Sequence, residues 1–197
     1  MFGGIPARLA QVVDTARVPV HIVFTRMMPA ARVALTSGPQ AVGGPIRLQH
    51  TATIKRPAAE VFAAVANPET YPHWSPSVPR VQKLTAGPLG VGTRFQAMAP
   101  GFGQGELEIS EYEKPTRVLI RAGTAVVDGT HLFLLRPEGD DTRVEQVARM
   151  KLKGPVVIMT PIALMWLAWT LHGDTERLKA YLARQAPRGR TDHGLPQ

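Results

Sequence analysis

Four polar residues lie in segments where they could orient a carbonyl or hydroxyl group of a bound molecule: His50, Tyr112, Arg121 and His131. Such side chains can polarise a ketone and transfer protons, which is the chemistry that an aldol ring closure or a dehydration requires. We predict that His50, Tyr112 and His131 point into one cavity. The alternative is that the His and Tyr side chains are hydrogen-bonded wall residues and that Arg121 faces solvent.

Other catalytic arrangements are excluded or disfavoured by the sequence. No Cys is present and no G-x-S-x-G motif occurs, so a nucleophilic mechanism has no support. The six His include no H-E-x-x-H or other close pair, and no Gly-Lys-Ser/Thr follows the glycines at 87, 90 and 92. Glu106 and Glu108 share one strand face, which more often means a solvated outer face than a carboxylate pair. We therefore expect no metal and no cofactor.

Large apolar side chains could line a pocket for a hydrophobic ligand. Aromatic and Met side chains are adaptable and suit such a lining, although the same residues also serve as ordinary core. The lining residues that we expect are Trp74, Phe95, Phe133, Met150, Met165, Trp166 and Trp169.

The first element that positions these groups is a strand over residues 46–55. Apolar or small residues alternate with polar ones there, which is typical of a half-buried strand. The alternation places His50 on the inward face with Leu48 and Ala52.

Two short helices are predicted after this strand. Pro57 suits the first position of a helix, and Asn67 with Pro68 ends that helix and can cap a second one. The second helix would contain Tyr71 and Trp74.

Six further strands are predicted downstream, separated by breaks rich in Gly, Pro and Asp, including Asp128-Gly129. Connections of hairpin length require antiparallel neighbours, because a parallel crossover needs a dozen residues or more. The pattern therefore predicts an antiparallel meander. The predicted strands cover residues 81–85, 93–99, 105–112, 116–125, 130–136 and 143–153.

The last element is a long helix over residues 160–185, with Thr160 as its expected N-cap, and it would be roughly 35 to 40 Å long. Residues 154–173 contain no Asp, Glu, Lys or Arg, which is long enough for a membrane span. However, a stripe of leucines continues through the charged second half of the helix. This continuity predicts a helix packed against protein. The stripe comprises Leu164, Leu167, Leu171, Leu178 and Leu182.

Three phrases of the chain resemble the START-like superfamily, also called SRPBCC, in its polyketide cyclase/dehydrase and lipid-transport branch. They run over residues 54–62 (IKRPAAEVF), 67–76 (NPETYPHWSP) and 90–95 (GVGTRF). The resemblance implies an α+β helix-grip fold, in which a curved seven-stranded antiparallel sheet wraps around the long C-terminal helix. It also implies a cavity between the sheet and that helix, in which members bind lipids, polyketides, quinones or hormones.

The domain is expected to cover residues 46–186. Residues 1–45 would form an N-terminal extension and linker with a short amphipathic helix around Ile5 and Leu9, and residues 187–197 a flexible tail. The net charge of +8 comes without a run of like charges or interleaved aromatics, so specific nucleic-acid binding is disfavoured. The lack of Cys and of a clear secretion signal favours the cytoplasm.

Three functions are compatible with these observations. The first is binding of a small hydrophobic ligand (lipid, polyketide or quinone-like) without turnover. The second is a cofactor-independent cyclase or dehydratase that uses His, Tyr and Arg as acid, base and oxyanion groups. The third is a peripheral protein that contacts an anionic membrane or a partner through residues 1–45 and the apolar half of the last helix. The sequence leaves the oligomeric state open.

Overall fold

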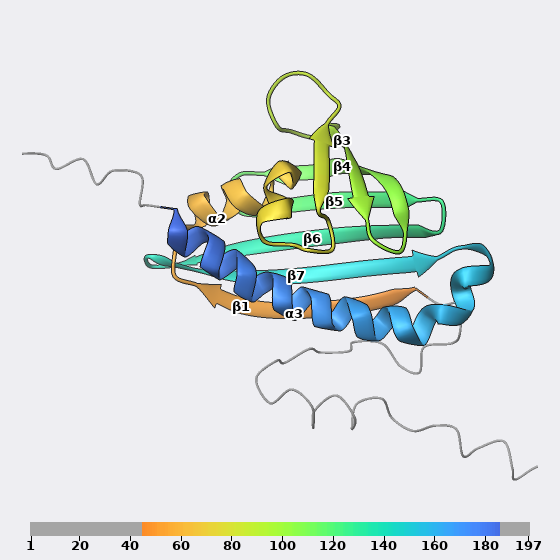
Figure 1. Cartoon of the computed structure of the whole chain (residues 1–197). Helices are drawn as coiled ribbons and strands as arrows, with labels where there is room; N and C mark the ends of the chain where they lie inside the picture. Colours follow the sequence, from red (N-terminus) through yellow and green to blue (C-terminus); the bar gives the residue numbers. More distant parts are fainter. Residues whose placement is uncertain (1–44, 186–197) are drawn as a thin grey trace, which may run out of the picture.

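The computed structural model describes residues 45–185, and these form one antiparallel sheet with helices on one face (Figure 1). The strand order is β1-β7-β6-β5-β4-β3-β2, so β2 to β7 form the predicted meander and β1 pairs with the last strand. The strands are β1 (Ile46–Ile54), β2 (Arg80–Lys83), β3 (Arg94–Ala99), β4 (Gly103–Glu113), β5 (Arg117–Thr124), β6 (Val127–Glu138) and β7 (Asp141–Leu152).

Two short helices follow β1, as predicted. Helix α2 (Ala58–Val65) comes first, and the 3₁₀ helix η1 (Pro68–His73) comes second. The Asn67 side chain accepts a hydrogen bond from the Glu69 backbone N–H at 3.1 Å, which confirms Asn67 as a cap. Pro72 lies inside η1 and has no N–H to donate, which suits a short helix better than an extended one.

The β5–β6 turn lies at residues 125–126, so the break expected at Asp128-Gly129 is wrong. The Thr124 hydroxyl accepts hydrogen bonds from the backbone N–H groups of Val126 and Val127, at 3.2 and 3.1 Å, and so closes the turn earlier. Gly129 lies within β6, and a side chain would not fit there: a Cβ at this position would lie 2.9 Å from the Arg149 carbonyl oxygen.

The long helix α3 (Thr160–Arg184) follows a 3₁₀ turn, η2 (Gly154–Met159), and lies along the sheet over β1 and β7 (Figure 1). Thr160 does not cap it, because its hydroxyl donates back to the Val157 carbonyl at 2.5 Å. The segment Gly154–Arg184 is long and apolar enough to cross a membrane by length and composition alone. Its leucine stripe nevertheless packs on the sheet: Leu164 is half-buried, and Leu167, Leu171, Leu178 and Leu182 are buried.

We call the face of the sheet that carries α2 and α3 the inner face. Its core is divided into two clusters. The first cluster joins α2 and the second half of α3 to the sheet and includes Phe62, Phe133 and Leu178. The second lies under the first half of α3 and includes Leu48 and Leu167. The expected helix around Ile5 and Leu9 and the expected C-terminal tail lie outside the described residues.

Candidate functional site

A row of polar side chains crosses the inner face between the two apolar clusters. We call it the inner polar row, and it consists of His50, His131, Gln146, His172 and Thr175. The register of β1 with β7 sets Gln146 directly opposite His50. The row therefore brings together strands β1, β6 and β7 and helix α3.

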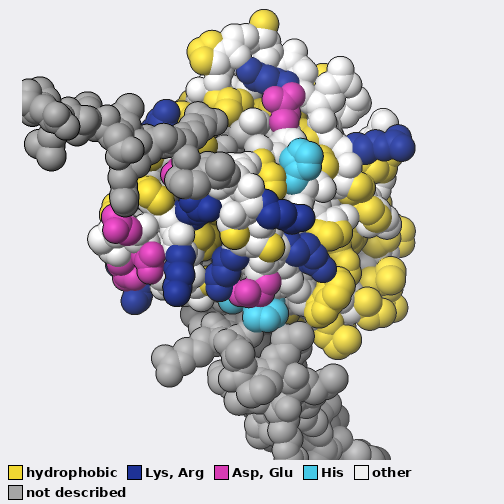
Figure 2. Space-filling model, turned by 60° about the vertical axis from the view of Figure 1, so that its left-hand side comes forward, with side chains coloured by type: hydrophobic (Ala, Val, Ile, Leu, Met, Phe, Trp, Pro, Cys, Tyr) yellow, Lys and Arg dark blue, Asp and Glu magenta, His cyan; other side chains and the backbone are white. Residues whose placement is uncertain are grey.

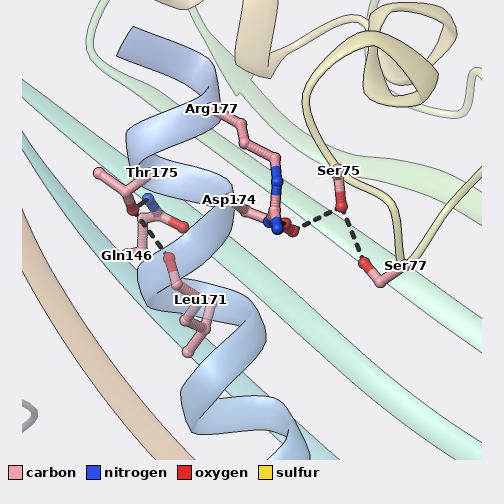
Figure 3. Close-up of polar contacts among 7 residues, drawn as sticks. All are labelled: Ser75, Ser77, Gln146, Leu171, Asp174, Thr175 and Arg177. Carbon is pink, nitrogen blue, oxygen red and sulfur yellow. Dashed lines mark hydrogen bonds and ion pairs between the residues drawn. The ribbon is translucent and has the colours of Figure 1, made fainter. Parts of the chain in front are cut away.

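One half of this row is a continuous hydrogen-bonded chain. His131 Nε2 lies 3.2 Å from Gln146 Oε1, and Gln146 Nε2 donates to Thr175 Oγ1 at 2.9 Å. Thr175 in turn donates to the Leu171 carbonyl at 2.9 Å (Figure 3). Because an amide oxygen only accepts, the proton of the neutral His131 ring is on Nε2.

Burial lowers the pKa of His131 to about 4, against the smaller opposing effect of the Gln146 hydrogen bond. The ring also packs on Phe133, with their centroids 4.1 Å apart. His131 is therefore a neutral group near pH 7, and its Nδ1 carries a lone pair.

The other half of the row has no such partners. His50 is 6% exposed, and within residues 45–185 neither of its ring nitrogens has a hydrogen-bond partner. The His172 ring lies edge-on to it with the centroids 5.7 Å apart, and His172 Nδ1 is likewise buried and unpartnered. The pKa of His50 is lowered, first by burial and then by the positive charges that His172 and Lys179 can carry. A buried imidazole without a partner is unusual, because most buried polar groups are hydrogen-bonded.

A second polar group lies on another side of α3, around Asp174 (Figure 3). Ser75 donates to Asp174 Oδ2 at 2.5 Å, and the Ser75 and Ser77 hydroxyls lie 2.8 Å apart. Arg177 contacts Asp174 Oδ1 at 3.4 Å. Burial raises the pKa of Asp174 to about 6, although the Ser75 hydrogen bond and Arg177 oppose the rise. This group ties the segment after η1 to α3, which is a structural role.

Gln146, Asp174 and Thr175 were missed by the sequence analysis. A signal for the two helix residues was present, because positions 174 and 175 continue the stripe between Leu171 and Leu178. A polar residue in a buried stripe requires a partner, and the sequence does not say where that partner lies.

Tyr112 lies on the inner face because β4 contains a bulge. The register with β5 shifts between Ile109 and Glu111, and Tyr112 then pairs with the buried Val118. Without the extra residue, Tyr112 would lie on the outer face. Its half-buried ring meets Phe62 edge-on, with the centroids 5.1 Å apart, so it contacts the first cluster rather than the inner polar row.

Arg121 lies on the outer face and is exposed, so it is not a member of the interior site. It pairs across the sheet with Glu108 and Thr130. These residues line a surface hollow of about 520 Å³, together with Glu106 and Arg149. The solvated outer face expected for the two Glu residues is what the structure has.

The expected lining residues divide into three groups. Trp74, Phe95 and Phe133 are buried in the first cluster, and Met150 and Trp166 are half-buried against the second. Met165 and Trp169 are wrong as lining residues, because they are 61% and 57% exposed on the side of α3 that faces away from the sheet. Helical periodicity alone does not say which of two apolar faces packs inward.

Two surface hollows of the described domain lie away from α3. The hollow beside Arg121 and a second of about 520 Å³ beside Arg80 and Gln96 have no lining residue from α3. Among residues 45–185, no group of three or more His, Asp or Glu side chains is placed to hold a metal ion.

Residues 45–183 match the family described as polyketide cyclase / dehydrase and lipid transport. The chain belongs to this family. Membership in the polyketide cyclase / dehydrase and lipid transport family confirms the branch predicted from residues 54–62, 67–76 and 90–95. No curated protein matches the sequence significantly.

Several solved structures have a similar fold. A START superfamily protein from Mycobacterium smegmatis superposes with a TM-score of 0.59 and 16% identity, over 70% of this chain and 97% of that one. A truncated norcoclaurine synthase from Thalictrum flavum gives a TM-score of 0.55 and 13% identity, over 75% and 99%. A protein from Arthrobacter aurescens gives 0.54 and 17%, over 83% and 100%. The expected helix-grip fold, a seven-stranded antiparallel sheet with a long C-terminal helix, is confirmed.

Proposed function

We propose that this protein binds a small hydrophobic molecule between the sheet and α3, and that His50 holds a polar atom of that molecule. The observation that carries the proposal is the buried His50 ring with two unpartnered nitrogens. A ligand carbonyl or hydroxyl there would satisfy a group whose desolvation is otherwise uncompensated.

The apolar part of the ligand would lie against the second cluster. This cluster borders the inner polar row and contains half-buried side chains that can move aside, among them Phe102, Met150 and Trp166. Phe102, in the β3–β4 turn, meets Trp166 of α3 with their ring centroids 5.4 Å apart. Separation of these two rings would open a path between the sheet and the first half of α3.

Binding without turnover fits the electrostatics of the row better than catalysis. The pKa of His131 is about 4 and that of His50 is lowered, first by burial, so both rings are weaker bases than an ordinary histidine. An efficient general acid or base has a pKa near the working pH. Neutral imidazoles can still donate and accept hydrogen bonds, which is what ligand orientation requires.

The test is native mass spectrometry of the purified full chain, followed by titration with the apolar dye 8-anilinonaphthalene-1-sulfonate. We expect a co-purified hydrophobic compound or saturable dye binding in the parent, and weaker binding by about tenfold in His50→Leu. His73→Leu is the matched control, because His73 is exposed on η1. Equal binding by the parent and His50→Leu would contradict the role of His50.

A cyclase or dehydratase is a second proposal, which one observation favours. His50, Tyr112 and His131 all occupy inner-face register positions, and a neighbour in fold is named a synthase. In that case Tyr112→Phe should reduce turnover of a polyketide-like substrate by about 100-fold while thermal unfolding is unchanged. Unchanged turnover would remove Tyr112 from the mechanism.

A further inference from the structure

The first half of α3 and the preceding η2 turn carry a line of exposed apolar side chains. We call Ile158, Ile162, Met165 and Trp169 the α3 stripe; they are 57% to 77% exposed. Their spacing of four, three and four residues puts them on one side of the helix. Contiguous exposed apolar side chains of this kind mark an interaction surface.

The stripe is a second apolar face and not a loosened part of the core. The opposite side of the same turns packs on the sheet through Ala163, Leu167 and Leu171, which are buried. The helix is therefore apolar on both sides over its first half. A helix with this pattern is expected to have an apolar environment on each side: the sheet on one side and a further apolar surface on the other.

Basic residues flank the stripe at both ends. Lys151 and Lys153 precede it and Arg177 follows it, with Asp174 and Glu176 beside Arg177, while residues 154–173 contain no Asp, Glu, Lys or Arg. The Arg177 guanidinium lies 6.0 Å from the centroid of the Trp169 ring, so a cation and an exposed indole are side by side. Figure 2 shows hydrophobic side chains gathered beside a group of Lys and Arg on one face of the molecule.

We propose that the α3 stripe inserts into the interfacial region of an anionic membrane, with the helix axis parallel to the membrane surface. Interfacial helices combine an apolar face, Trp at headgroup depth and basic residues that meet anionic lipid. The net charge of +8 adds a general attraction to such a surface. The helix would remain packed on the sheet and would not cross the bilayer.

A second copy of the chain is the competing occupant, because the spacing of the stripe also suits a helix pair. Its charges disfavour that pairing. In an antiparallel pair Lys153 of one copy would approach Arg177 of the other, and in a parallel pair Arg177 would face its own equivalent. Like charges repel in either case, although the ion pairs of Lys153 with Asp128 and of Arg177 with Asp174 reduce this repulsion, whereas the net charge of +8 attracts anionic headgroups.

The experiment is co-sedimentation of the full chain with vesicles of phosphatidylcholine alone and of phosphatidylcholine mixed with phosphatidylglycerol. We expect binding to the mixed vesicles that weakens as NaCl is raised. Ile162→Glu and Met165→Glu should each reduce it by about tenfold or more, because a carboxylate would enter the apolar layer. Val91→Glu is the control, since Val91 is 68% exposed but lies outside α3.

Brominated phosphatidylcholine in the mixed vesicles quenches an indole that enters the lipid, which gives a second readout of insertion. Trp169 is the exposed indole, whereas Trp74 is buried and Trp166 half-buried. We expect quenching of the parent and much less quenching of Trp169→Phe.

Absence of vesicle binding, or equal binding by parent and both Glu variants, would overturn the proposal. A dimer of the parent in analytical ultracentrifugation would also overturn it, if Ile162→Glu dissociates that dimer and brominated lipid does not quench the parent. His50→Leu should bind vesicles like the parent, so failure of the membrane proposal and failure of the ligand proposal are distinguishable.

Discussion

His50 of β1 and His172 of α3 meet edge to face, with their ring centroids 5.7 Å apart, and three of their ring nitrogens are buried without a partner among the described residues. The two rings come from opposite ends of the described chain. A stable fold tolerates such an arrangement at a cost, because each buried group without a hydrogen bond loses its hydration. Buried polar groups that lose hydration without gaining a hydrogen bond are often found at functional sites.

Replacement of His50 by Leu should therefore stabilise the ligand-free protein. We expect the free energy of unfolding to rise by about 1 to 3 kcal/mol, because an unpartnered imidazole is exchanged for an apolar side chain of similar size. Urea unfolding of parent and variant measures the difference. A destabilised His50→Leu variant would mean that the ring has partners in solution.

His131 should titrate far below an ordinary histidine. Burial lowers its pKa to about 4, and the Gln146 amide oxygen selects the tautomer with the proton on Nε2. Nitrogen-15 NMR of the imidazole rings measures both properties, with His131→Asn used to assign the signal. A pKa near 6.5 would show that the ring is hydrated.

The low pKa of His131 also predicts how stability changes with pH. The unfolded chain binds a proton at this residue near pH 6.5 and the folded chain only near pH 4. The contribution of neutral His131 to the free energy of unfolding is therefore fully present above about pH 6.5. It is lost as the pH falls toward 4, and the free energy of unfolding decreases by about 1 to 3 kcal/mol. Unfolding experiments on the parent and His131→Asn across this range would isolate it.

Asp174 should change the stability of the protein with pH in the opposite direction to His131. Its folded pKa of about 6 lies above the usual 3.8, so the folded state favours the protonated carboxyl. The resulting stability is present below about pH 4 and is lost as the pH rises through 6. In Asp174→Asn the amide oxygen can still accept the Ser75 hydrogen bond. Relative to the parent, this variant should gain about 1 to 3 kcal/mol between pH 4 and 7. A pH-independent difference would contradict the raised pKa.

The packing of α3 can be tested with two residues on opposite sides of the helix. Leu171 is 3% exposed, and Leu171→Ala should cost about 2 to 5 kcal/mol through lost contacts and the cavity left behind. Met165 is exposed, so Met165→Ala should change stability by less than about 0.5 kcal/mol. Thermal and urea unfolding without detergent measures both. Equal effects would mean that the orientation of α3 is different from the one described.

Most of the secondary structure was predictable because its signals are local. Alternation in residues 46–55 predicted a strand that is observed at Ile46–Ile54, and the leucine stripe predicted a helix that is observed at Thr160–Arg184. Short connections required antiparallel neighbours, so the meander followed as well. The β5–β6 turn was misplaced because the Thr124 hydroxyl closes it, and Asp128-Gly129 only resembles a turn.

The membership of the interior site depended on tertiary structure. Tyr112 lies on the inner face because of a bulge, and a bulge reverses the side on which all later residues of a strand lie. Met165 and Trp169 are on the outside because α3 has two apolar faces, and only contact with the sheet decides which is buried. Gln146 became part of the site through its partners on β6 and α3, which are distant in sequence. The chain's own residues thus determined the strands, the helices and the order in which they follow one another. The choice of side chains that meet in the interior was decided by register and helix rotation, because these depend on the packing of the whole domain.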